Sequence, residues 1–224
     1  MKTLPIVIVA IAGLTLLGVA GSTLSQHTPQ QQTPQPSPTS SITQTPVPSQ
    51  STTSATTPAP ADAVSAHQVK VSTSMGDIVL NLYPEDAPLA VQNFVTLGKR
   101  GYYNGTIFHR VIKGFMSQGG DPTGTGSGGE SIYGKVFKTE ITQHQFGPGA
   151  LGGARTDAMD TNGSQFFIDA ADAQFLNGKY TQFGQTADDA SLTVAKAIND
   201  VQTSKANDKP LNDVKITGFT ITKA

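Results

Sequence analysis

The chain has 224 residues, a formal net charge of −1 and no cysteine, which excludes disulfides, thiol catalysis and zinc–thiolate sites. It has no block of basic residues, so electrostatically driven binding to nucleic acid has little support and none is expected. Length alone allows one or two domains. Composition favours one, because 9 of the 14 prolines lie in the first 60 residues, while all 10 Phe and all 5 Tyr lie beyond residue 66.

The chain begins with a short basic and apolar segment. Met1-Lys2 is followed by apolar residues up to about Ala20, as in a secretory signal peptide. The small residues Val19-Ala20-Gly21 suit signal-peptidase cleavage. A stretch of about 17 residues is also near the shortest that spans a bilayer, so a retained anchor is the alternative, and a buried helix is the remaining one. Residues 1–25 therefore predict export and an extracytoplasmic (secreted, periplasmic or cell-envelope) location.

Residues 26–66 are rich in Pro, Ser, Thr and Gln and contain no aromatic residue. Such a segment cannot bury enough apolar surface to offset the entropy lost on ordering, so a disordered linker is predicted. Its prolines favour extended backbone, which also suits a stalk that holds a domain away from a membrane. The folded domain is expected to span residues 67–224.

The predicted elements of this domain begin with a β-hairpin over residues 68–83, where apolar and polar residues alternate around a turn at 75–77. Pro88 opens an amphipathic helix that stops near Gly98. Residues 108–120 read as one or two strands. A long glycine-rich loop then follows.

The second half of the domain continues the same pattern. Short strands are predicted at 150–155, 165–169 and 182–185, a second helix at 191–201 and a closing strand at 214–221. Many short strands with two helices predict a mainly β fold, a closed antiparallel β-barrel capped by two α-helices.

The segment Phe108–Gly120 carries the most informative chemistry. On extended backbone, residues two apart share a face, so 108, 110 and 112 lie together, as do 116 and 118. This pattern brings the Arg110 guanidinium close to apolar side chains and to the Gln118 amide. Such a site suits a neutral peptide better than a phosphate or a metal, because no nucleophile–base pair or carboxylate pair lies nearby.

The same segment, with Tyr103–Ile107 leading into it, resembles the signature of the cyclophilin family of peptidyl-prolyl cis–trans isomerases. Two further runs, Asn162–Ile168 and Phe175–Gly184, resemble other blocks of that family in the same order. The resemblance covers about residues 67–224 and is closest in type to a bacterial exported cyclophilin. It implies an eight-stranded barrel, proline-containing polypeptides as substrates, and no cofactor or metal.

The resemblance also implies roles for the matching residues. Arg110 takes the catalytic position, and Gln118 orients it. The proline pocket is formed by Phe115, Met116, Phe167 and Leu176. The other substrate-binding positions are Ala154, Arg155, Gln165, Phe175 and Tyr180. The alternatives are a surface salt bridge for the arginine and ordinary core packing for the apolar residues.

The implied reaction needs no covalent step. Rotation about an X–Pro bond has a barrier of about 20 kcal/mol and takes tens of seconds or longer. Twisting removes the amide resonance and makes the nitrogen basic, so a fixed donor such as Arg110 binds the twisted state more strongly than the planar one. Because no proton is transferred, His109 is interpreted as structural or supporting rather than as an acid–base group.

Several positions depart from the family pattern. Phe175 stands where Trp is common, and the lost indole N–H predicts weak binding of cyclosporin. Tyr180 stands where His is common, and Arg155 replaces a common Asn. Gly152-Gly153 replace a usual Ser-Met, which is expected to loosen the strand beside the substrate groove.

These observations predict a monomeric isomerase that speeds the folding of exported proteins and contacts a membrane only through residues 1–25, if they are retained. The alternative is a non-catalytic proline-peptide binding or chaperone module that uses the same groove. A wall-attached structural protein is a third possibility and rests on the linker alone. Arg110 favours the enzyme, since a binding module can lose it. The glycine-rich loop lacks the Gly-Lys-Ser/Thr ending of a phosphate loop.

Overall fold

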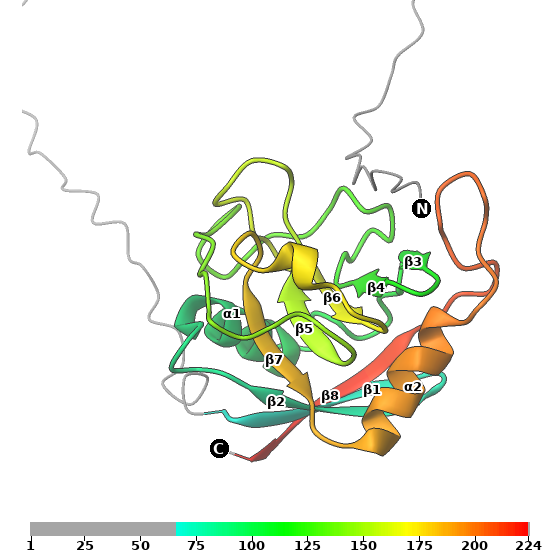
Figure 1. Ribbon diagram of the computed structural model, residues 1–224, viewed down its shortest axis with the longest axis horizontal. Helices are drawn as coiled ribbons and strands as arrows, with labels where there is room; N and C mark the ends of the chain where they lie inside the picture. Colours follow the sequence, from blue (N-terminus) through cyan, green and yellow to red (C-terminus); the bar gives the residue numbers. More distant parts are fainter. Residues whose placement is uncertain (1–65, 224) are drawn as a thin grey trace, which may run out of the picture. The chain divides into compact units, whose positions relative to one another are not determined.

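An eight-stranded antiparallel sheet curls around a core of large apolar side chains in the computed structural model, which describes residues 66–223 (Figure 1). The predicted export segment, and the predicted linker except for Ala66, lie outside the described residues. Within residues 66–223 no helix has the length and apolar character needed to cross a bilayer.

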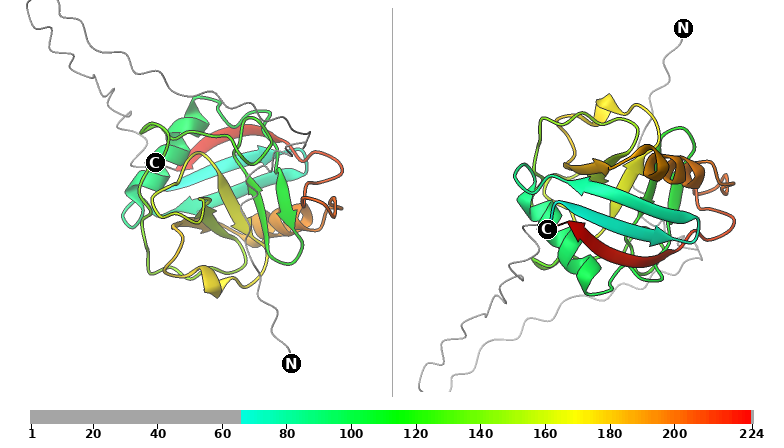
Figure 2. Two further views of the ribbon diagram at one scale, coloured as in Figure 1. Left: turned by 90° about the horizontal axis from the view of Figure 1, so that it is seen from above. Right: turned by 90° about the horizontal axis from the view of Figure 1, so that it is seen from below.

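The strands are short, and each pairs only with antiparallel neighbours. They are β1 Gln68–Thr73, β2 Gly76–Leu82, β3 Arg110–Ile112, β4 Met116–Gly119, β5 Ala150–Gly153, β6 Phe166–Asp169, β7 Gln182–Thr186 and β8 Ile216–Lys223. Their order in the sheet is β3-β4-β6-β5-β7-β2-β1-β8. Helices α1 (Pro88–Lys99) and α2 (Asp189–Asn199) lie on opposite sides of the curled sheet (Figures 1 and 2).

The predicted closed barrel is not confirmed, because the strand order ends at β3 on one side and β8 on the other. The segment before β3 does reach the start of β8: Phe108 N–H donates to the Val214 carbonyl at 3.0 Å, and Ile107 forms an isolated bridge with Lys215. At β3 itself, the Val111 N–H instead donates to the carbonyl of Asp208, in the loop between α2 and β8, at 2.8 Å. This loop therefore occupies the edge where β8 would have to pair.

The structure confirms the first hairpin, which was predicted from the alternation of apolar and polar residues. Val71 faces Ile78 across the β1–β2 ladder, and both are buried. The turn is closed by Thr73, whose hydroxyl donates to the Gly76 carbonyl at 2.7 Å and accepts from the Met75 N–H at 3.1 Å. Gly76 has a φ of +130°, which a residue with a side chain rarely adopts.

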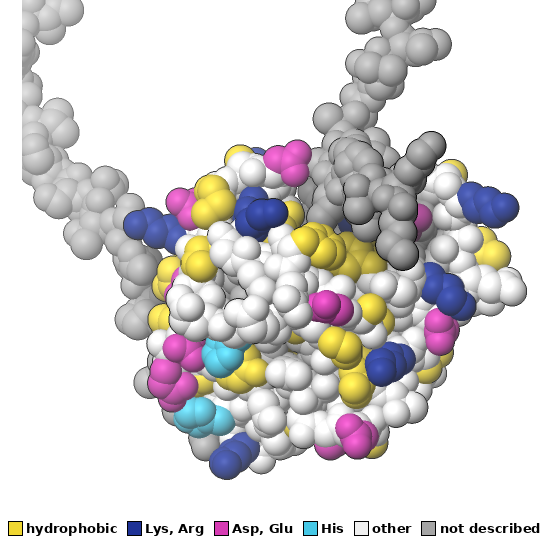
Figure 3. Space-filling model, viewed as in Figure 1, with side chains coloured by type: hydrophobic (Ala, Val, Ile, Leu, Met, Phe, Trp, Pro, Cys, Tyr) yellow, Lys and Arg dark blue, Asp and Glu magenta, His cyan; other side chains and the backbone are white. Residues whose placement is uncertain are grey.

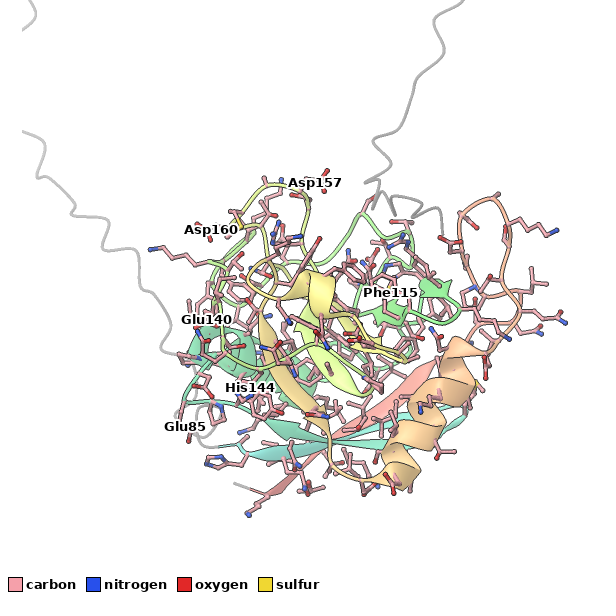
Figure 4. All side chains as sticks on the ribbon, viewed as in Figure 1. Glu85, Phe115, Glu140, His144, Asp157 and Asp160 are labelled. Carbon is pink, nitrogen blue, oxygen red and sulfur yellow. The ribbon has the colours of Figure 1, made fainter. Side chains whose placement is uncertain are left out.

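Helix α1 supplies the centre of the core. The ring of Phe94 packs against the rings of four aromatic residues, with centroids 5.1 to 5.4 Å apart: Tyr103, Phe166, Phe183 and Phe219. These spacings are typical of tilted and edge-to-face aromatic pairs. The start of the helix is fixed by Glu140, whose carboxylate accepts from the N–H groups of Leu89 at 3.0 Å and Ala90 at 2.9 Å (Figure 4).

Other element boundaries differ from the predictions by a few residues. The predicted 150–155 strand ends at Gly153. Helix α2 starts two residues earlier than predicted, because Asp188 caps it by accepting from the Ser191 N–H at 2.7 Å. A 3₁₀ turn, η2 (Gln174–Leu176), was not predicted, since three residues are too few to show a periodic pattern.

Candidate functional site

In the β3–β4 hairpin, the predicted site residues of the two strands pair directly with one another. Arg110 lies directly across from Gln118, and Ile112 lies across from Met116. Asn199 at the end of α2 braces the hairpin: its amide nitrogen donates to the Ile112 carbonyl at 2.9 Å, and its oxygen accepts from the Gly114 N–H at 2.7 Å. The position of the arginine therefore depends on a helix more than 80 residues away in sequence.

The two predicted glutamines meet side chain to side chain. Gln118 donates its amide N–H to the Gln165 amide oxygen at 2.8 Å. Gln165 in turn donates to the carbonyls of Gly126 at 3.1 Å and Gly128 at 2.7 Å. No side-chain hydrogen bond joins Gln118 to Arg110 within the described residues; the two residues are neighbours through the pairing of their strands.

A buried carboxylate, which the sequence analysis did not single out, organises the glycine-rich loop. Asp121 is fully buried and accepts from the backbone N–H groups of Thr123 and Gly126, each at 2.7 Å, and of Gly128 at 3.1 Å. Burial acts to raise its pKa, but the hydrogen bonds from Thr123, Gly128 and Gly126 outweigh burial and lower the pKa to about 2. The loop amides thus surround the protein's own carboxylate rather than a bound anion such as phosphate.

The predicted proline pocket comes together from three elements. Its side chains are buried and come from β4 and the turn before it, from β6 and from η2: Phe115, Met116, Phe167 and Leu176. Phe175 remains 46% exposed, with its ring 5.3 Å from that of Phe115, so it forms the rim (Figure 4 labels Phe115). Phe146, which the sequence analysis did not identify, stacks on the Phe167 ring with centroids 5.8 Å apart.

The glycine pair in β5 has a role opposite to the one expected. Gly152 lies directly across from Phe167, and a Cβ on Gly152 would overlap the phenylalanine ring. The strand stays paired with β6 on one side and with β7 on the other, and its register with β7 shifts between Leu151 and Gly152. The absent side chain instead makes room for the aromatic ring of Phe167.

The remaining predicted site residues, Ala154, Arg155 and Tyr180, follow β5 and η2 in the chain. Ala154 continues the pairing beyond β5, donating its N–H to the Gln165 carbonyl at 3.0 Å. The Arg155 guanidinium lies 4.5 Å from the centroid of the Tyr180 ring and donates to the Lys179 carbonyl at 2.6 Å. It also donates to the carbonyl of Thr156 at 2.7 Å. These contacts join the backbone of residues 155–156 to the turn at Lys179, which follows η2. The Tyr180 ring packs edge-on against Phe167.

Comparison with known proteins identifies the family. The family model described as cyclophilin type peptidyl-prolyl cis-trans isomerase matches residues 68–221. The chain belongs to the cyclophilin family. Its function is accordingly that of a cyclophilin-type peptidyl-prolyl cis–trans isomerase, the activity for which its homologues are named.

Two similar proteins are named for the same activity. Peptidyl-prolyl cis-trans isomerase cypE of Dictyostelium discoideum is 49% identical over 150 residues, covering 66% of this chain and 93% of that protein. Peptidyl-prolyl cis-trans isomerase-like 1 of Homo sapiens is 49% identical over 157 residues, covering 69% and 92%. Both are eukaryotic, so neither supports the expected bacterial exported type.

A solved structure shares the fold. The crystal structure of a cyclophilin type isomerase of Cryptosporidium parvum superposes with a TM-score of 0.66 at 39% identity, covering 70% of this chain and 98% of that one. The same protein was also crystallised in the presence of the dipeptide Ala-Pro, with the same TM-score.

His109 of this cyclophilin is buried, and neither ring nitrogen has a hydrogen-bond partner in the described residues. Burial lowers the pKa of the imidazole; Asp121 acts to raise it and Arg110 to lower it. Gly126 lies against the ring, so that a Cβ there would sit 3.3 Å from the imidazole Cδ2. A neutral ring packed beneath the loop fits the structural interpretation of His109.

A second buried carboxyl lies next to the pocket and has no partner. Asp169 in β6 is opposite Met116 and two residues beyond Phe167, and it is fully buried. Neither of its carboxyl oxygens has a hydrogen-bond partner within residues 66–223. Burial raises its pKa to about 8, so the group is protonated at neutral pH. Nothing in the sequence indicates this burial, since an aspartate at a strand end usually meets solvent.

Gly152→Ala tests the close approach of Phe167. We expect kcat/KM for X–Pro isomerisation to fall roughly tenfold or more, because the new Cβ displaces the pocket ring. Exchange spectroscopy on a proline peptide measures the rate. Gly147→Ala is the control, since nothing lies within 4 Å of a Cβ there, and its rate should equal that of the wild type. Unchanged activity and stability in Gly152→Ala would contradict the packing role.

Asp169→Asn tests the buried carboxyl. The pKa is raised from 3.8 to about 8 on folding, so the folded state holds a proton that the unfolded chain releases. The resulting stability is fully present below about pH 4 and is lost as the pH rises towards 8, by an amount on the order of a few kcal/mol. Urea unfolding at several pH values measures it. The wild type should weaken relative to the variant from pH 5 to 9; parallel curves would refute the assignment.

Proposed function

We propose that the isomerase reaction is carried out by Arg110 beside the Phe115–Phe167 pocket. What supports this is the state of the guanidinium: its side chain is 26% exposed, and its one charged partner in residues 66–223 is Asp208, at 3.7 Å from Nε. The two Nη groups have no protein partner there and remain available to a bound peptide. The substrate proline ring occupies the pocket, while the part of the peptide before it rotates.

The energies required fit one charged donor plus a pocket. Bringing an exchange time of tens of seconds to milliseconds needs about 10⁴-fold acceleration, or about 5–6 kcal/mol. Loss of a single preorganised donor typically costs about 10²–10³-fold. Arg110 would therefore supply more than half of the barrier reduction by donating to the amide nitrogen as it loses resonance. Holding the proline ring against apolar side chains supplies the remainder by restricting the substrate to rotation about one bond.

The alternative is a binding module that uses the same groove without catalysis. The pocket alone would serve that purpose, and a planar X–Pro peptide gains little from a donor aimed at its nitrogen. The arginine would then be dispensable. Its retention directly across from Gln118, whose amide is held by Gln165, favours catalysis.

Arg110→Ala separates the two functions. The expected result is a fall in kcat and kcat/KM together by on the order of 10²–10³-fold, with peptide affinity nearly unchanged, because the donor acts mainly in the transition state. Arg110→Lys keeps the charge and loses the planar fork, so it should recover little. Lys113→Ala, at the exposed hairpin turn, is the control. A full rate in Arg110→Ala would favour the binding module or another catalytic group.

We further propose that the substrates are exported proteins during their folding. The support is the sequence before the domain: a basic start, an apolar stretch to about Ala20 and a 41-residue polar linker, 26–66, with eight prolines. At about 3.1 Å per residue in extended polyproline form, such a linker spans at most about 130 Å. This reach would let the domain act on chains emerging at a membrane surface, whether residues 1–25 are retained or removed.

Protease protection tests the location. Protease added to intact spheroplasts should remove the domain if residues 1–25 anchor it, and a cleaved form should appear in the released fraction with its start near Ser22. A cytosolic marker protein that stays intact is the control. Full-length protein confined to the cytosol would overturn the export proposal and leave the isomerase function unaffected.

A further inference from the structure

The loop between α2 and β8 makes two contacts with consecutive residues of β3. The carbonyl of Asp208 accepts from the Val111 N–H at 2.8 Å, and its carboxylate lies 3.7 Å from the Nε of Arg110. One loop residue thus holds both the backbone of the edge strand and the side chain that the strand presents. Neither the fold nor the pocket requires the carboxylate, since the backbone contact alone ties the loop to β3.

Backbone contacts within the loop fix the position of Asp208. The Asp208 N–H donates to the Ser204 carbonyl at 3.0 Å, and the Ser204 N–H donates to the Lys209 carbonyl at 2.8 Å. Thr203 and Pro210 form an isolated bridge at its base. Asp208 itself has a φ of +57°, in the left-handed region that Asn and Asp tolerate better than other residues with side chains. Its conformation is therefore set by the loop rather than by the ion pair.

We propose that Asp208 is a positioning residue for the catalytic arginine: its carboxylate holds the Nε side of the Arg110 guanidinium and so directs the Nη groups towards the peptide. This inference rests on the proposed role of Arg110. A nearby negative charge also weakens a cationic donor, and this effect alone would make kcat rise when the carboxylate is removed. The two effects have opposite signs in kcat, so a single substitution decides between them.

The contact is a modest one. Both side chains are partly exposed, 26% for Arg110 and 45% for Asp208, and exposed ion pairs add little to stability. The ion pair acts by orienting the guanidinium, because a long side chain that is held at one end loses fewer rotamers when the substrate binds. The expected kinetic effect is correspondingly small, about two- to fivefold in kcat.

The experiment uses Asp208→Asn in the full chain, which keeps the shape and tolerates the positive φ. With an uncharged, blocked X–Pro peptide, kcat should fall about two- to fivefold while KM stays constant. Asp208→Gly also accepts this φ and lacks the carboxylate, so it should show the same loss. Asp160→Asn is the matched control, with a φ of +60° in an exposed loop where its carboxylate accepts from the Thr139 N–H, and its kinetics should be unchanged.

Two further readouts separate positioning from a structural effect. Raising the salt from about 0.02 to 0.5 M should screen the pair and lower kcat in the wild type, while Asp208→Asn should show no such dependence. In an Arg110→Ala background, Asp208→Asn should have no additional effect. An unchanged or raised kcat in Asp208→Asn overturns the positioning role. If Arg110→Ala itself keeps the full rate, the proposed catalytic function fails, and this inference fails with it.

Discussion

The site depends on the register of four neighbouring strands. Across β3, β4, β6 and β5, one row of directly paired residues reads Arg110, Gln118, Phe167 and Gly152. This row sets the guanidinium proposed as catalytic, an amide, the ring of the proposed pocket and the space for that ring side by side. A slip of one residue in any ladder would turn each side chain to the opposite face and abolish the site. The same pairing therefore determines both the fold and the chemistry.

Strand pairing fixes backbone positions, but the polar side chains also need support from outside the sheet. Three loop or helix residues provide it through hydrogen bonds and charge: Asp121 shapes the loop that holds Gln165, Asn199 braces the β3–β4 hairpin, and Asp208 meets the guanidinium. Asn199 and Asp208 act across a long sequence separation, whereas Asp121 binds amides of the loop that directly follows it. Such prior ordering lowers the conformational entropy that the protein's side chains lose when a peptide binds.

Sequence reasoning succeeded where the signal was local. Alternation gave the first hairpin, and Pro88 with helical spacing gave α1. The pocket residues are proposed from the family resemblance, since periodicity alone cannot tell pocket from core. The supporting residues were missed because their partners are distant: nothing near Asp208 in sequence indicates Arg110, and nothing near Gly152 indicates the Phe167 ring. The predicted closure of the barrel is not confirmed, because the loop between α2 and β8 occupies the outer edge of β3.

Two buried aspartates show why residue type alone could not reveal these roles. Asp121 and Asp169 are both fully enclosed, yet the pKa of the first is lowered to about 2 and that of the second is raised to about 8. The difference lies in the donors: loop amides surround Asp121, while Asp169 has no hydrogen-bond partner in the described residues. One carboxylate stabilises the loop by being charged, and the other is tolerated only by being neutral. The region next to Phe167 is thereby kept free of a negative charge at neutral pH, which suits the proposed pocket for a proline ring.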